Sequence, residues 1–154
     1  MNRLFLICPE CCLESKIINH FGDNSFFYTS LAAIFDFSDF KLMEEINQVI
    51  VSESITEILI VNDLQCTFIL ETILGEPSFN SNSTRILKQL TFELKNDNEI
   101  SKLKPSSLCY KSITYMSNQI RETAFVGGKI EKGELGLKGL LYNRVNNEFE
   151  EILI

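Results

Sequence analysis

Short apolar runs, separated by longer amphipathic stretches, set the pattern of this chain. Continuous apolar runs of four to six residues are typical of strands that are buried on both faces of a parallel sheet. The aromatic stretch at residues 26–28 also favours a strand. Strands are therefore predicted at residues 4–7, 26–28 and 58–61, and residues 137–142 and 149–153 add two strands joined by a turn at residues 146–147.

Helical periodicity fills most of the intervals between these runs. It is clearest in residues 38–52, where apolar side chains recur at helical spacing and Ser38 can cap the first turn. Residues 13–21 fit either a helix or a loop. Further helices are predicted at residues 65–74, from Thr84 to beyond Leu94, and within residues 107–129. Strands that alternate with helices predict an α/β fold with a mostly parallel central sheet flanked by helices.

Composition narrows the classes of partner. The 154 residues suit a single domain, residues 1–154, and 45% of them are apolar. The net charge is −7 and no cluster of Lys and Arg interrupts it, so neither nucleic acid nor an anionic membrane is an expected partner. No apolar run is long enough to span a bilayer. Five cysteines, three of them within residues 8–12, favour reduced thiols or a metal site in the cytoplasm over a disulfide framework.

The residues that could bind a ligand or metal directly follow the ends of two predicted strands. Cys8 directly follows the first apolar run, and residues 62–66, which end at Cys66, directly follow the run at 58–61. Ligands of open parallel sheets bind at the carboxyl ends of the strands. The sequence therefore places Cys8 and Cys66 on the same edge of the sheet.

These two segments resemble the β-carbonic anhydrases. That family has Cys-x-Asp-x-Arg after its first strand, where this chain reads Cys8-Pro9-Glu10-Cys11-Cys12. The family has Gly-His-x-x-Cys-Gly after a later strand, where this chain reads Asn62-Asp63-Leu64-Gln65-Cys66-Thr67.

Two further segments extend the resemblance over most of the chain. Gly22-Asp23, followed by Phe26-Phe27-Tyr28-Thr29-Ser30, is similar to the family's Gly-Asp-x-Phe-Val-Val-Arg-Asn, without its Arg-Asn pair. Residues 133–143, which read GELGLKGLLYN, are similar to Gly-x-Leu-x-Leu-His-Gly-x-x-Tyr-Asp. The resemblance implies a single β-carbonic-anhydrase-like domain that assembles at least as a homodimer.

The resemblance also implies roles for individual residues. Two Cys and one His hold zinc in the family, so Cys8 and Cys66 are expected metal ligands, and Asp63 stands at the position of the His. Glu10 stands for the Asp of the catalytic Asp-Arg pair, and Cys12 for its Arg. A carboxylate in place of a neutral imidazole makes a zinc centre more negative and its bound water less acidic. Little or no CO2 hydration is therefore expected.

Other interpretations of the same residues stay open. One is an active zinc lyase or hydrolase that acts on CO2 or a similar small molecule; the site could also bind a small molecule or an anion without catalysis. Cys8-x-x-Cys11 has the spacing of a thiol-redox motif and equally that of two metal ligands, so Cys11 could complete a metal site. The cysteines could also be plain core residues without metal. His20 is expected at the surface, and Cys109 in the core.

Overall fold

Strands and helices alternate along the chain in the computed structural model, which describes residues 1–78, 80–97 and 103–154. The elements follow in the order β1 (Asn2–Ile7), η1 (Pro9–Cys11), α1 (Glu14–Phe21), β2 (Ser25–Thr29), η2 (Leu31–Ala33), α2 (Phe40–Ser52), β3 (Ile55–Asp63), α3 (Thr67–Leu74), α4 (Asn82–Asp97), α5 (Pro105–Arg121), α6 (Ala124–Glu131), β4 (Gly136–Asn143) and β5 (Glu148–Ile152). Each of the five predicted strands is present.

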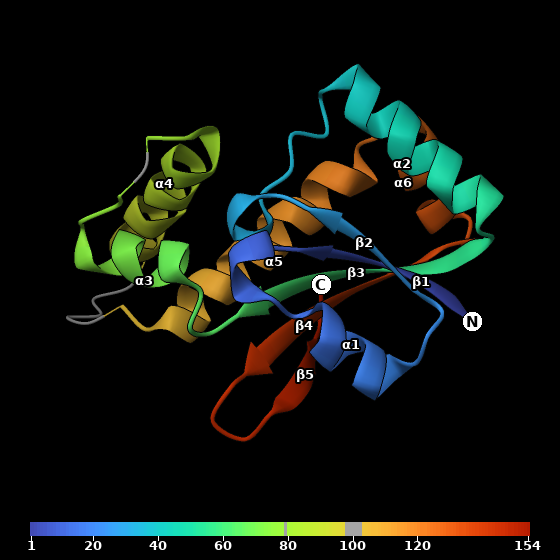
Figure 1. Cartoon of the computed structure of the whole chain (residues 1–154). Coiled ribbons are helices and arrows are strands. Elements are labelled where there is room, and N and C mark those ends of the chain that lie inside the picture. Colours follow the sequence, from blue (N-terminus) through green and yellow to red (C-terminus); the bar gives the residue numbers. More distant parts are fainter. Residues whose placement is uncertain (79, 98–102) are drawn as a thin grey trace.

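One five-stranded sheet organises the fold, in the order β2-β1-β3-β4-β5 (Figure 1). The pairs β1–β2, β1–β3 and β3–β4 are parallel, whereas β5 returns antiparallel to β4. The continuous apolar runs lie on β1 and β3 in the middle of the sheet, where residues 4–7 and 58–61 are almost fully buried. The predicted α/β fold with a mostly parallel sheet is confirmed.

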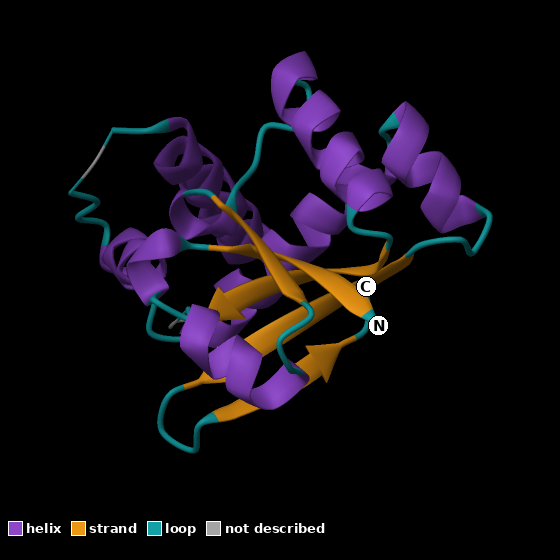
Figure 2. Cartoon of the chain, turned by 45° about the vertical axis from the view of Figure 1, so that its right-hand side comes forward, coloured by secondary structure: helices purple, strands orange, loops and turns teal. Residues whose placement is uncertain are grey.

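Helices cover the sheet on both faces. Figures 1 and 2 show α1 on one side of the sheet and α2, α5 and α6 on the other. The long helix α5 packs on β3 and β4, and α3 and α4 pack together beyond the ends at which the parallel strands finish. None of the described helices combines the length and the apolar character that a membrane crossing needs.

Several predicted helix boundaries were wrong, each for a local reason. Asp39, not Ser38, caps α2, because its carboxylate accepts the backbone N–H groups of Lys41 and Leu42. Helix α4 begins before Thr84. The helix expected within residues 107–129 is two helices, since the chain leaves helical geometry at Thr123, which caps α6. Helix α4 extends to Asp97, and residues 98–102, which follow it, lie outside the described residues.

Candidate metal centre

The ends of β1 and β3 bring the cysteine segments together. The two strands are parallel neighbours, with Leu6 opposite Ile60, so both chains leave the sheet at the same edge. Cys8 follows β1 in an extended conformation, and Pro9 then starts the short 3-10 turn η1, which ends at Cys11. Cys66 is the N-cap residue of α3. The predicted placement of Cys8 and Cys66 on one sheet edge is confirmed.

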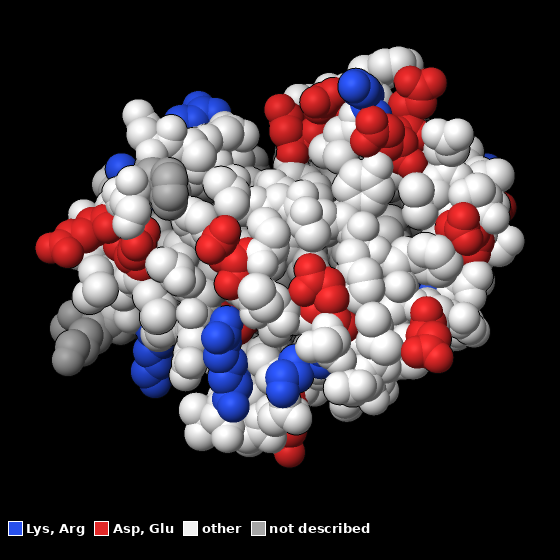
Figure 3. Space-filling model, in the orientation of Figure 1, with Lys and Arg blue, Asp and Glu red and all other residues white. Residues whose placement is uncertain are grey.

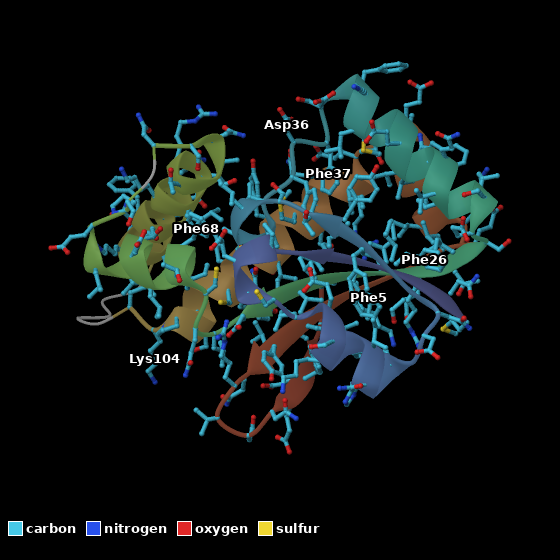
Figure 4. The ribbon with its side chains drawn as sticks, viewed as in Figure 1. Phe5, Phe26, Asp36, Phe37, Phe68 and Lys104 are labelled. Carbon is cyan, nitrogen blue, oxygen red and sulfur yellow. The ribbon has the colours of Figure 1, made fainter. Side chains whose placement is uncertain are left out.

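Three buried sulfur atoms meet at this edge. The Sγ atoms of Cys8, Cys11 and Cys66 all lie within 4.8 Å of one another, and in Figure 4 sulfur atoms gather beside Phe68. A zinc–sulfur bond is about 2.3 Å long, so thiolates that share an ion in tetrahedral geometry lie about 4 Å apart. Donor type, spacing and burial therefore fit a thiophilic metal ion.

The three thiols share hydrogen bonds. Contacts with the thiols of Cys11 and Cys66 lower the pKa of Cys8, and the backbone N–H of Ala32 also donates to Cys8 Sγ at 3.2 Å. Contacts with Cys66 and Cys8, together with burial, raise the pKa of Cys11. The first thiolate of the cluster is therefore held on Cys8, which is the form that binds metals.

Asp63 is not a member of this close sulfur group. Its side chain is fully buried, and Arg144 Nε donates to its Oδ2 at 2.6 Å. The backbone N–H of Gln65 donates to the other oxygen at 2.8 Å. Contact with the carboxylate of Asp63 raises the pKa of Arg144. In this structure the residue at the position of the family's His is thus one half of an ion pair.

Glu10 and Cys12 line two different pockets. Glu10 is exposed and lines a cavity of about 270 Å³ with Leu31, Thr67, Phe68 and Glu71. Cys12 is exposed, with a left-handed backbone (φ 51°), and lines a second pocket with Lys16 and Arg144.

The remaining candidates lie where the sequence predicted. His20 is exposed, and its ring packs against those of Phe21 and Phe149. Cys109 is fully buried in α5, and its Sγ donates to the backbone oxygen of Asp63 at 3.8 Å. Arg144 was missed, because it lies in a turn far along the chain and carries no motif.

Comparison with known proteins shows which known fold this chain shares. No protein-family profile matches the sequence, and neither does any curated protein. Among solved structures, the chain is similar to the β-carbonic anhydrase CafD of Aspergillus fumigatus, with a TM-score of 0.81, 14% identity, and coverage of 99% of this chain and 90% of the other.

Two more solved structures of β-carbonic anhydrases are similar to this chain. One is a tetrameric β-carbonic anhydrase of Sordaria macrospora, with a TM-score of 0.77, 12% identity, and coverage of 99% and 81%. The other is the Coccomyxa β-carbonic anhydrase in complex with acetazolamide, with a TM-score of 0.70, 12% identity, and coverage of 99% and 72%. The chain therefore has the fold of the β-carbonic anhydrases, as the four sequence segments predicted.

Proposed function

We propose that this protein is a divergent carbonic-anhydrase-like protein that binds zinc at Cys8 and Cys66 and hydrates CO2 slowly or not at all. The observation that carries the proposal is the donor set at the sheet edge. Two cysteines stand where the family holds zinc, but the further donors nearby are the thiol of Cys11 and the carboxylate of Asp63. No imidazole is a member of the close ligand group found among the described residues.

The charge of the centre is the same whichever residue is the third ligand. Two thiolates and a neutral imidazole cancel the charge of Zn²⁺, whereas either Asp63 or a third thiolate from Cys11 leaves a net charge of −1. A more negative centre is a weaker Lewis acid and lowers the pKa of bound water less. Hydroxide, the nucleophile that hydration needs, is then scarce at neutral pH.

The surroundings of Glu10 also disfavour hydration. Glu10 and Glu71 line the same small cavity. Hydrogen bonds from the side chain and backbone of Ser78 lower the pKa of Glu71, which keeps it ionised at neutral pH. Two carboxylates disfavour an anion such as bicarbonate, the product of hydration, inside this cavity. Cys12 offers no charge to hold Glu10 in place, so Glu10 is at most a weak counterpart of the family's catalytic Asp.

Stopped-flow CO2 hydration on zinc-loaded protein tests this function. We expect turnover close to the uncatalysed rate for the unmodified protein. We expect it to stay low in Asp63→His, which gains an imidazole but leaves Arg144 without its partner. Activity is expected to rise in the combined variant Asp63→His, Glu10→Asp, Cys12→Arg. Rapid hydration by the unmodified protein would contradict the proposal and favour the active zinc lyase or hydrolase.

A thiol-redox protein is the second candidate. The observation that favours it is the mutual contact of the three thiols, with the pKa of Cys8 lowered by Cys11 and Cys66. Metal content separates the two functions. Elemental analysis of protein purified without chelator should find close to one zinc per chain for the first and none for the second.

Self-association and a reducing compartment complete the proposal. The Sordaria relative is described as tetrameric, and we infer that this chain forms at least a homodimer. The five cysteines are all unpaired in the structure. Free thiols that must stay reduced to bind metal suit the cytoplasm.

A further inference from the structure

One side chain ties together the two segments that carry the clustered cysteines. Arg144 lies in the turn between β4 and β5, where Lys16 and Cys12 line the same pocket. Its Nε donates to Asp63 Oδ2 at 2.6 Å, and its Nη2 donates to the backbone oxygen of Cys11 at 3.4 Å. Asp63 leads directly into the Cys66 segment, since the Cys66 N–H donates to the Asp63 backbone oxygen at 3.0 Å.

Both carboxylate oxygens of Asp63 are held by hydrogen bonds in this arrangement, and neither belongs to the close donor group of Cys8, Cys11 and Cys66. Arg144 occupies Oδ2, and the backbone N–H of Gln65 occupies Oδ1. The side chain is fully buried, so turning it towards the sulfur cluster would break both hydrogen bonds and leave the guanidinium unpaired. Asp63 is the buried partner of the pair and Arg144 is 43% exposed, so the cost of this turn is the loss of the two hydrogen bonds that satisfy the buried carboxylate.

We propose that Arg144 is the positioning residue of the metal centre, holding Cys11 in the ligand shell and Asp63 outside it. The inference rests on the proposed metal site and deepens it. With Asp63 withheld, the protein's own donors are three sulfur atoms. Such a set selects thiophilic ions such as Zn²⁺, Co²⁺ or Cd²⁺ over Mg²⁺, Ca²⁺ and Mn²⁺, which prefer oxygen ligands.

The geometry requires a guanidinium rather than any cation. Two donors of one planar fork reach two acceptors on different segments, which a single ammonium on a flexible stem does less well. Figure 3 shows that basic side chains gather on the lower part of this face, near α1 and the β4–β5 turn. Lys16 lines the Arg144 pocket but forms no ion pair with Asp63, so it serves as a control for charge alone.

Cobalt titration of the reduced, metal-free full chain tests the proposal. The sulfur-to-cobalt charge-transfer band reports how many thiolates bind, and competition with a chelator gives the affinity. For the unmodified protein we expect the intensity of three thiolates. Asp63→Asn should keep that intensity, and Cys11→Ser should reduce it to that of two.

Substitution of Arg144 should act on both readouts. Loss of a residue that orients metal ligands typically weakens binding about 10-fold to 100-fold. We expect a loss of that size for Arg144→Gln, together with a fall towards two thiolates as Cys11 is released. Arg144→Lys, which keeps the charge next to Asp63, should stay folded and show an intermediate affinity. Lys16→Gln should match the unmodified protein.

Three results would overturn parts of this picture in different ways. If Arg144→Gln and Arg144→Lys both bind cobalt as the unmodified protein does, Arg144 does not position the site. If Asp63→Asn alters the cobalt spectrum and Arg144→Gln does not, Asp63 is a ligand and the three-sulfur shell is wrong. If the unmodified protein takes up no cobalt at all, the proposed metal centre itself fails, and the role of Arg144 with it.

Discussion

The five cysteines of this chain differ in exposure, and their reactivity should follow. Cys8, Cys11, Cys66 and Cys109 are buried, whereas Cys12 is exposed. The turn that buries Cys11 beside Cys8 turns the next residue outward in a left-handed conformation. Cys11 and Cys12 are adjacent in sequence, but one is buried and the other is exposed to solvent.

Thiol alkylation measures this difference. We expect iodoacetamide to modify a single thiol rapidly in the native protein, because the other four are shielded by the fold. Cys12→Ser should abolish the fast phase and leave the slow modification unchanged. Mass spectrometry of the intact chain counts the added groups. Two or more fast groups in the native protein would mean that the sulfur cluster is open to solvent.

Only the site residues that lie next to a recognisable strand or motif could be predicted from the sequence. Cys8 and Cys66 follow apolar runs, so the strand-end rule located both. Asp63 was assigned by its position in the motif, and nothing nearby in the sequence indicates its ion pair. Arg144 is 81 residues from Asp63, and only the pairing of β3 with β4 brings the end of β3 close to the turn that carries it.

At the scale of elements, Gly139 sets how closely α5 approaches the sheet. A Cβ built on this β4 residue would lie 2.6 Å from side-chain atoms of both Ile113 and Ile152. Ile113 belongs to α5 and is fully buried. The absence of a side chain at Gly139 therefore lets the helix and the last strand pack against the centre of β4.

Gly139→Ala should consequently destabilise the fold. Overpacking of a filled core costs about 1–3 kcal/mol, and denaturant unfolding measures the loss. Gly128→Ala is the matched control, since a Cβ there meets nothing within 4 Å and alanine favours a helix by about 1 kcal/mol over glycine. Equal stabilities for the two variants would show that α5 can move away from the sheet at little cost.

Elements were predicted better than their boundaries. The continuous apolar runs of β1 and β3 are strong signals, because residues 4–7 and 58–61 are covered on both faces of the sheet. The boundary between α5 and α6 is a weak signal, since Ile120 and Ala124 keep helical spacing across the polar residues 121–123, and only the cap at Thr123 marks the break. A helix cap depends on the local backbone conformation, and the spacing of apolar residues along the sequence does not predict that conformation.

At the scale of the whole molecule, β2 forms one edge of the sheet, and among the described strands it pairs with β1 alone. Its aromatic side chains, Phe26, Phe27 and Tyr28, are half-buried. An unprotected edge strand with apolar side chains tends to pair with another chain. This edge therefore suits contact with a second copy.

Light scattering should accordingly find at least a dimer at micromolar concentration. Thr29→Lys adds a charge to an exposed β2 position and should shift the protein towards the monomer. Leu153→Lys, at a residue that is 90% exposed and follows the opposite edge strand, should leave a dimer formed through β2 intact. A monomeric unmodified protein would contradict the proposed self-association.

The meeting of the β1 and β3 ends also bears on the unfolded chain. Cys8 and Cys66 are roughly sixty residues apart in sequence, so an ion that bridges them closes a long loop, as a disulfide would. Because the ion leaves when the chain unfolds, it stabilises the fold by mass action, by about 2.7 kcal/mol when the free ion is at about 100 times its dissociation constant. The ion would thus act as a reversible staple, which the cell can insert or withdraw through its supply of metal, and the lifetime of the protein would follow that supply.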